Sequence, residues 1–208
     1  MRIPVAVEGW PFVLVPAAAA CILGWLGWWW TAAVLGLLSL ACLGFFRDPE
    51  RTPPGMSGAV LAPADGRVVR IDQVEDPWVG RAVRTSIFLS PLDVHVNRSP
   101  VAALVESVRH EAGRFMAAYR DDASELNERC TIALQGEAAR IGVKQIAGVL
   151  ARRIVCRVRA GDKLAAGERF GLIRFGSRTD LVVPGTTEMR VKIGDRVRGG
   201  ETVMGVLR

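Results

Sequence analysis

The sequence is poor in the residues from which metal sites and disulfide frameworks are built. Its 208 residues include only four cysteines and two histidines. The cysteines show no C-x-x-C spacing and form no dense framework, which argues against both a metal site and a disulfide scaffold. A nucleic-acid recognition motif is also missing, although the net charge of +6 allows an anionic partner. We therefore expect no metal and no nucleic acid, and we keep anionic lipid or a phosphorylated substrate as partners.

Charge is absent from the first part of the chain. From Gly9 to Phe46 no residue is charged, and as one straight helix this run would reach ~57 Å at ~1.5 Å per residue. A bilayer core is only ~30 Å thick, so one span is too short for the whole run, whereas two spans of ~20 residues slightly exceed it. A short helical hairpin over residues 1–46 fits best, with its turn near residues 24–27 and tryptophans at the membrane interface.

Arginines at both ends orient this expected hairpin. Arg2 precedes it and Arg47 and Arg51 follow it, and positive charge favours the cytoplasmic face. We expect an anchor in the cell (inner) membrane with the rest of the chain on the cytoplasmic side, and we leave open whether the hairpin spans or only dips into the bilayer. A cleaved signal peptide fits less well, because its apolar core would be only ~7–15 residues long. A buried core helix is the remaining alternative.

Prolines and a glycine between residues 47 and 55 end the helical part and mark a domain boundary. Beyond it, runs such as Arg67–Ile71 and Ala82–Leu89 alternate or are rich in strand-forming residues. Residues 111–128 are the least strand-like, and we expect a loop with a helical turn there, suited to a lid over a site. The fold class we predict is mainly β (α+β), with residues 47–208 as one β-rich domain.

The C-terminal third contains an internal repeat. Val158–Glu168 recurs as Val191–Glu201, each copy consisting of strand, Gly-Asp turn, strand and turn. The pattern resembles the duplicated hairpins of barrel-sandwich hybrid domains, the fold of biotinyl and lipoyl carriers. Carriers need a lysine at the tip between the two halves. Here the linking segment carries Gly176-Ser177 instead, which argues against a swinging arm.

The dipeptide Gly176-Ser177 is the main candidate for chemistry. Glycine tolerates positive φ and leaves its carbonyl carbon open to attack, and the next residue supplies a hydroxyl. With a base and an oxyanion donor nearby, such a peptide could undergo an N-to-O acyl shift. On its own, however, Gly-Ser between two hydrophobic runs is typical of an ordinary turn.

Two further side chains are candidates for acid–base roles. His95 lies in a segment bracketed by two prolines, where it alternates with valines and would project from a different face. Histidine is the simplest general acid or base near neutral pH. Asp65 lies in an Asp-Gly turn, where an aspartate usually serves local hydrogen bonding. The second histidine, His110, stands in a polar run and is interpreted as structural.

Six short motifs occur in this chain in the same order as in one known family. The resemblance is to phosphatidylserine decarboxylases, in particular their short, archaeal-type branch, which is also found in bacteria. It covers about Phe45 to Arg208, whereas the N-terminal apolar run matches only in character. The matching motifs are Phe45-Phe46-Arg47-Asp48-Pro49, Ala62-Pro63-Ala64-Asp65-Gly66, Leu89-Ser90-Pro91-Leu92-Asp93-Val94-His95, Asn127-Glu128-Arg129, Gly167-Glu168-Arg169-Phe170-Gly171 and Phe175-Gly176-Ser177.

The resemblance implies a proenzyme that cuts itself between Gly176 and Ser177. Ser177 would attack the preceding carbonyl to give an ester, and β-elimination and hydrolysis would leave a pyruvoyl group, so that no separate cofactor or metal is needed. The products would be a membrane-bound β chain of residues 1–176 and an α chain of residues 177–208, together forming a heterodimer or a higher oligomer. The pyruvoyl ketone would form a Schiff base with phosphatidylserine, release carbon dioxide and yield phosphatidylethanolamine.

The resemblance also implies roles for other side chains. Asp65 and His95 match family positions linked to self-cleavage and to proton transfer. Longer members carry a second histidine three residues beyond, where this sequence has Arg98. Either His95 serves both steps, oriented by Asp65 as in a Ser-His-Asp relay, or Arg98 takes over charge stabilisation; we favour the first. The substrate phosphate would be held by Arg98, Arg114 or Arg178.

Two other classes remain open at this point. A membrane-anchored barrel-sandwich adaptor without catalysis would stay an intact single chain and would not need Ser177. A pyruvoyl decarboxylase of a soluble amino acid would not need the apolar hairpin.

Overall fold

The computed structural model describes residues 4–116, 126–148, 153–174 and 177–207. The chain divides into two compact units, Met1–Glu50 and Arg51–Arg208. The first is helical and the second is mainly antiparallel β.

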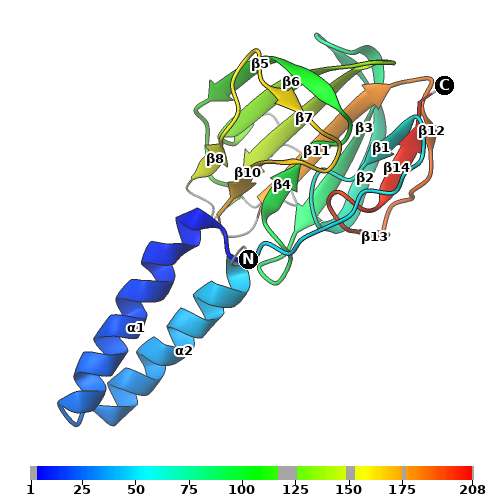
Figure 1. The fold of residues 1–208 in the computed structure, drawn as a ribbon. Helices are drawn as coiled ribbons and strands as arrows, with labels where there is room; N and C mark the ends of the chain where they lie inside the picture. The colour runs from blue at the N-terminus through cyan, green and yellow to red at the C-terminus, as the bar shows by residue number, and fades with distance from the viewer. Residues whose placement is uncertain (1–3, 117–125, 149–152, 175–176, 208) are drawn as a thin grey trace. The chain divides into compact units, whose positions relative to one another are not determined.

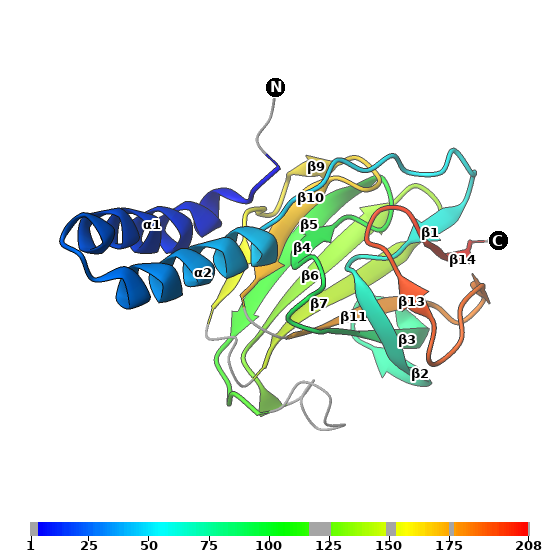
Figure 2. The same cartoon turned by 90° about the horizontal axis from the view of Figure 1, so that it is seen from below.

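The first unit is a helical hairpin. A short 3-10 turn, η1 (Val7–Gly9), leads into α1 (Trp10–Trp25), and α2 (Trp29–Phe45) returns beside it (Figures 1 and 2). The connection overlaps the predicted turn and contains Gly27, whose φ of 84° is the left-handed conformation that glycine adopts without strain. The Ser39 hydroxyl donates to the Val13 carbonyl at 2.8 Å, which ties the two helices together.

Residues just beyond α2 also belong to this unit. The Asp48 amide donates to the Pro4 carbonyl at 2.7 Å, and Val5 and Arg47 form an isolated β-bridge. The helical segment Val7–Trp25, 19 residues long, is long and apolar enough to cross a membrane, since it reaches ~28 Å at ~1.5 Å per residue. The second apolar helix has 17 residues and is shorter than that.

The second unit confirms a mainly β fold. Its strands form an eight-stranded sheet and two three-stranded sheets. The strands are β1 (Ala59–Leu61), β2 (Gly66–Asp76), β3 (Gly80–Leu89), β4 (Val96–Arg98), β5 (Ala103–Glu111), β6 (Arg129–Gly136), β7 (Arg140–Ala147), β8 (Ile154–Cys156), β9 (Lys163–Leu164), β10 (Arg169–Ile173), β11 (Ser177–Pro184), β12 (Glu188–Met189), β13 (Arg196–Val197) and β14 (Val203–Val206).

The large sheet is strongly curled into a half-barrel, and β11 lies in its middle. The strand order is β13-β2-β3-β11-β7-β6-β5-β9, and all of these pairs are antiparallel (Figures 1 and 2). Leu181 and Val183 of β11 belong to the hydrophobic core. Because side chains alternate along a strand, Ser177 and Thr179 share that inner face, whereas Arg178 and its neighbours at even positions point to the other face.

The two copies of the internal repeat lie at the two edges of this sheet. In the first, Gly161 donates to the Val105 carbonyl at 2.8 Å; in the second, Gly194 donates to the Val68 carbonyl at 2.8 Å. The two glycines have nearly equal φ angles, 92° and 97°. At the ends of the copies, a Cβ built on Gly167 would lie 3.5 Å from the Gly200 carbonyl oxygen. The repeat therefore brings the edges of the curled sheet together.

In the three-stranded sheet β4-β10-β8, strand β10 ends at Ile173, shortly before the predicted cleavage site at Gly176-Ser177. Leu172 of β10 pairs with Val96 of β4 on one side and with Val155 of β8 on the other. The third sheet, β1-β14-β12, joins the start of the unit to its C-terminal end.

Candidate active site

Ser177 is the first residue of β11 and lies at one end of the sheet centre. It pairs with Leu89 of β3 and with Ala147 of β7, and it is 0% exposed. Its Oγ atom is buried and has no hydrogen-bond partner among the described residues. A buried hydroxyl without a partner costs about 1–3 kcal/mol, and such groups tend to occur at sites of function. Gly176, the other half of the predicted cleavage site, lies outside the described residues.

Beside Ser177, on the same inner face, lies a buried amide network. Thr179 pairs directly with Gln145 across the β11–β7 ladder. The Gln145 Nε2 donates to Asn97 Oδ1 at 2.8 Å, and Asn97 Nδ2 donates to Thr179 Oγ1 at 3.3 Å. All three side chains are 0% exposed.

One polar atom of the Gln145 side chain is not used in this network. Its Oε1 is buried and has no hydrogen-bond partner among the described residues. Since Ser177 pairs with Ala147, Gln145 is its diagonal neighbour, at ~7–8 Å between backbones and within reach of a long side chain. An acceptor and a hydroxyl, both buried and without hydrogen-bond partners among the described residues, therefore lie on the same face of two neighbouring strands.

His95 is buried in the segment between β3 and β4, at 2% exposure. Its Nδ1 lies 2.9 Å from the Asp93 carbonyl oxygen. A carbonyl only accepts, so Nδ1 carries the hydrogen, and in the neutral ring Nε2 holds the lone pair that a base needs. The Asp93 carboxylate in turn accepts from the Ser90 amide at 2.8 Å and from its hydroxyl at 2.7 Å, which fixes the turn before His95.

His95 is also hydrogen-bonded to β10, the strand that precedes the predicted cleavage site. The Ile173 amide of β10 donates to the His95 carbonyl at 3.3 Å. Two residues beyond His95, Asn97 contacts Thr179, which itself lies two residues beyond Ser177. The structure therefore brings the His95 segment onto the inner face of β11 near Ser177.

Asp65 has different partners from those of the expected relay. Its Oδ2 accepts from Arg51 at 2.7 Å and its Oδ1 accepts from the Gly199 amide at 2.8 Å. No hydrogen bond joins Asp65 to His95 within the described ranges, and the His95 Nδ1 is held by a backbone carbonyl instead. Asp65 fastens the turn before β2 to the second copy of the repeat.

The three arginines considered for the phosphate lie in different surroundings. Arg98 is 3% exposed and donates to the Gly167 carbonyl at 3.0 Å. Arg178 is 1% exposed, and its Nε donates to Asp180 Oδ1 at 2.7 Å on the face opposite Ser177. Arg114 alone of the three is exposed, and its guanidinium makes no hydrogen bond or ion pair with the residues that the structure describes.

Asn127 connects the exposed Arg114 segment to the site. It is 0% exposed, and its Nδ2 donates to the Ala147 carbonyl at 2.7 Å and to the Met116 carbonyl at 2.8 Å. Ala147 is the residue opposite Ser177. Asn127 belongs to the motif Asn127-Glu128-Arg129. No pattern in the sequence, however, indicates that its side chain holds residues 114–116 beside Ser177. The expected lid residues 117–125 lie outside the described ranges.

Acidic side chains with shifted pKa values lie away from this site. Burial raises the pKa of Asp76, but amide donors from Trp78 and Val79 and the Lys144 ammonium outweigh it, so that the net pKa lies below its usual value of 3.8. Burial also raises the pKa of Asp72, but the hydrogen bonds and positive charges of Arg84 and Arg70 outweigh this effect. The pKa of Asp72 is therefore lowered as well. These shifts mark structural ion pairs.

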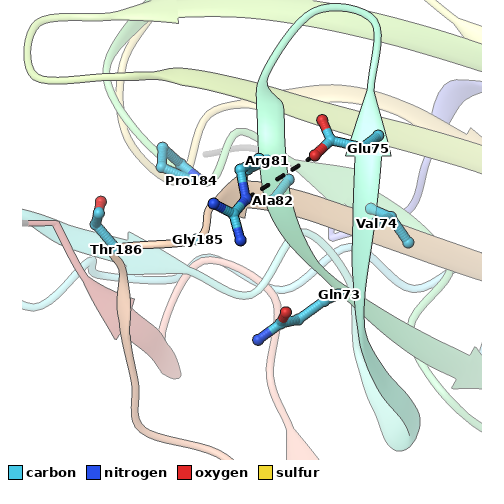
Figure 3. Close-up of a pocket in the computed structure, with 8 residues that line it drawn as sticks. All are labelled: Gln73, Val74, Glu75, Arg81, Ala82, Pro184, Gly185 and Thr186. Carbon is cyan, nitrogen blue, oxygen red and sulfur yellow. Dashed lines mark ion pairs between the residues drawn. The ribbon is translucent and has the colours of Figure 1, made fainter.

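A surface pocket of about 500 Å³ lies at the other end of β11 (Figure 3). It is lined by Gln73, Val74, Glu75, Arg81, Ala82, Pro184, Gly185 and Thr186. Pro184 pairs with Ala82, whereas Ser177 pairs with Leu89, so the pocket is roughly 23 Å from Ser177 along the strand at ~3.3 Å per residue. The Arg81–Glu75 pair in it is exposed, at 91% and 75%. This pocket is therefore separate from the Ser177 site.

Comparisons with known proteins agree with these observations. A family model described as phosphatidylserine decarboxylase matches residues 38–205. A phosphatidylserine decarboxylase proenzyme from Symbiobacterium thermophilum is 49% identical over 211 residues, which cover 100% of this chain and 98% of the relative. Proenzymes of the same description from Nocardia farcinica and Nitrosomonas europaea are 47% and 43% identical, covering 98% and 96% of this chain and 88% and 94% of the relatives.

The chain therefore belongs to the phosphatidylserine decarboxylase family. The resemblance that the motifs indicated is confirmed at the level of the family. Its short, archaeal-type branch is not specified by these matches and stays a prediction.

Proposed function

We propose that this protein removes the carboxyl group of phosphatidylserine by means of a pyruvoyl group that it makes from its own Ser177. By family it is a carboxy-lyase of phospholipid biosynthesis, made as a proenzyme. The observation that carries the proposal is the Ser177 Oγ, which is buried in the sheet centre without a partner among the described residues.

In the proposed self-cleavage, the Ser177 Oγ attacks the Gly176 carbonyl carbon. The C–N bond breaks, the nitrogen takes the hydroxyl proton, and an ester remains. Removal of the Ser177 Cα proton then expels the Gly176 carboxylate and leaves dehydroalanine, which water converts to a ketone with release of ammonia. The ladder on both sides of Ser177 would hold the new α chain, residues 177–208, against the β chain, residues 1–176.

The surroundings of Ser177 fit a pyruvoyl group. The position is enclosed, and the neighbouring Gln145 Oε1 has no partner among the described residues, so it is able to orient a polar group there. When formed, the ketone supplies an electron sink for the loss of carbon dioxide from a bound amine. Asn97 and Thr179 hold the Gln145 side chain in place, and we assign the three residues to positioning.

His95 is the proposed proton carrier. Its Nδ1 is committed to the Asp93 carbonyl, so Nε2 would take the Ser177 proton and later deliver a proton to the substrate carbon. We expect His95→Ala to block carbon dioxide release and to slow self-cleavage, as measured by product formation and by intact mass. A fully active His95→Ala variant would remove His95 from the mechanism.

Asp65 and Arg98 are proposed to support self-cleavage from a distance. The Pro63 carbonyl, two residues before Asp65, accepts the Arg98 amide at 2.9 Å, so the Asp65 turn packs against β4. Asp65 would hold this turn through Arg51 and Gly199. Arg98 stands where longer members carry a second histidine, which supports the short, archaeal-type branch.

Arg114 is the proposed contact for the substrate phosphate. It is the exposed arginine of the three, and Asn127 connects its segment to Ala147 opposite Ser177. An arginine binds phosphate with two parallel hydrogen bonds. The buried Arg98 and Arg178 would contribute positive charge and structure rather than direct contact.

The helical hairpin is proposed to anchor the protein in the cell (inner) membrane, with the β domain on the cytoplasmic side. Its supporting features are the apolar Val7–Trp25 segment and the exposed Trp25, Trp29 and Trp30 near the connection, since tryptophan settles at membrane interfaces. A lipid substrate explains such a hairpin, whereas a soluble amino acid would not need it. We also propose that the β domain is of the barrel-sandwich-hybrid type, which the paired repeat turns support.

Intact-mass measurement of the full chain tests the proposal. Wild type should yield two fragments split after Gly176, the smaller one lacking an amine terminus, together with conversion of phosphatidylserine to phosphatidylethanolamine. Ser177→Ala should stay uncut and inactive. Ser107→Ala, which alters an exposed serine of β5, is the matched control and should behave as wild type. An uncut wild-type chain that still decarboxylates the lipid would refute the proposal.

A further inference from the structure

A cluster of one histidine and two cysteines lies away from Ser177. The Nε2 of His110 is 3.5 Å from the Cys130 Sγ. The ligand atoms of His110, Cys130 and Cys156 all lie within 4.8 Å of one another. Both cysteines are free thiols, and nothing in the proposed decarboxylation uses them.

Three separate strands bring these side chains together. His110 of β5 and Cys130 of β6 are direct partners in their ladder, so their spacing is set by the sheet. Cys156 comes from β8 of the three-stranded sheet β4-β10-β8, where it pairs with Gly171 of β10. The three residues are far apart in the chain, so no local spacing motif indicates the cluster. The expectation of no metal rested on local cysteine spacing and therefore did not cover it.

The donor set is the one that zinc prefers. Zinc takes thiolate sulfur at ~2.3 Å and imidazole nitrogen at ~2.0–2.1 Å, so its ligand atoms lie ~3.5–3.8 Å apart in a tetrahedron. The ligand atoms here all lie within 4.8 Å of one another, which is close to this spacing. We propose that His110, Cys130 and Cys156 bind a thiophilic divalent ion such as zinc, with water at the fourth position.

Burial supports an ion rather than simple packing of two thiols. Cys130 is 0% exposed, Cys156 is half-buried and His110 is exposed. The sulfurs are therefore sheltered, while the imidazole side leaves a path for entry and room for a water ligand. A disulfide between the two cysteines would need no third donor, yet the imidazole converges on the same pair of sulfurs.

The ion would join two sheets close to the cleavage segment. His110 and Cys130 belong to the eight-stranded sheet, whereas Cys156 belongs to β4-β10-β8. Strand β10 ends at Ile173, whose amide bonds to the His95 carbonyl. A bound ion would therefore hold the strand that carries the cleavage segment against the sheet that carries Ser177. This consequence rests on the proposed function, but the binding itself does not.

Metal content of the full chain tests the site. The detergent-solubilised chain, kept under a thiol-free reductant, would be dialysed against zinc alone and measured by elemental mass spectrometry and chelator competition. We expect one zinc per chain, bound at least tenfold more weakly by Cys156→Ser and His110→Gln, and unchanged in Cys42→Ser, a matched change in α2. Cobalt in place of zinc should show a thiolate charge-transfer band that Cys156→Ser weakens.

The choice of variants separates metal binding from misfolding and from self-cleavage. His110→Gln changes an exposed side chain, so loss of zinc in it does not reflect misfolding. Measurement in the uncut Ser177→Ala chain separates metal binding from self-cleavage. Zinc retained equally by His110→Gln and Cys156→Ser, or no stoichiometric zinc in the reduced wild type, would overturn the proposal. A Cys130–Cys156 disulfide in a chain that binds no zinc after reduction would overturn it as well.

Discussion

Removing the charge of Asp180 should destabilise the sheet centre strongly. Arg178 and Asp180 are 1% and 0% exposed, and the Arg178 Nε lies 2.7 Å from Asp180 Oδ1. The same guanidinium donates to the Ser86 hydroxyl of β3 at 2.6 Å. Asp180→Asn keeps the shape but removes the negative charge that lies 2.7 Å from a buried guanidinium, and breaking a buried ion pair in this way costs about 3–5 kcal/mol. That is a large part of a domain stability of about 5–15 kcal/mol.

Hydrogen exchange measured by mass spectrometry on the full Ser177→Ala chain is the assay, because this chain stays uncut under the proposal. Protection of amides in β11 and β3 should fall by roughly two to four powers of ten in Asp180→Asn. The control is Glu188→Gln, which breaks the exposed Arg190–Glu188 pair, 53% and 43% exposed. Exposed pairs are worth about 0–1 kcal/mol, so exchange should hardly change.

A different result would return Arg178 to the role of a phosphate contact. If Asp180→Asn and Glu188→Gln exchange alike, the buried pair does not stabilise the sheet and the reasoning is wrong. If Arg178→Met then raises KM for phosphatidylserine vesicles while exchange stays normal, Arg178 acts on the substrate.

Three further changes test other parts of the structure. Asn127→Ala removes three hydrogen bonds, one to Ala147 and two to Met116, so exchange around residues 113–116 should speed up and self-cleavage should slow, while β2 stays protected; unchanged kinetics would contradict the clamp. Arg114→Ala should raise KM for phosphatidylserine vesicles at least about tenfold, from the loss of a charged hydrogen bond of about 1.5–3 kcal/mol, with Arg114→Lys recovering part of it; an effect on kcat alone would argue against phosphate contact. Asp76→Asn should cost about 1 kcal/mol near neutral pH. Because the pKa of Asp76 is lowered from 3.8 in the folded state, this difference is present above about pH 4 and vanishes as pH falls through the folded pKa; a difference that grows in acid would contradict the sign.

Local pattern was enough to predict the helical hairpin, the β-rich domain and the repeat. The charge-free run, the alternation in stretches such as Ala82–Leu89 and the paired Gly-Asp turns are properties of neighbouring residues, and they correspond to α1 and α2, to β3 and to the two edge turns. The ordered motifs led to the family for the same reason, since each motif is contiguous.

Side-chain partners could not be predicted in the same way, because they depend on which strands become neighbours. Asp65 was expected beside His95, but it holds Arg51 and Gly199. Nothing near Gln145 in the sequence indicates that it lies diagonally across from Ser177. Asp93, only two residues from His95, is the residue whose carbonyl fixes the imidazole.

By itself the sequence determined what kind of protein this is: an apolar helical pair, a β domain with a duplicated turn, and the motifs of a phosphatidylserine decarboxylase. These follow from hydrophobic period and turn chemistry, which act over a few residues. Only the tertiary structure decided that the buried Ser177 hydroxyl has no hydrogen-bond partner among the described residues, that Arg178 pairs with Asp180, and that three distant side chains form the proposed zinc site. The reason is that burial and long-range pairing arise when the sheet curls and closes, and no short stretch of chain carries that information.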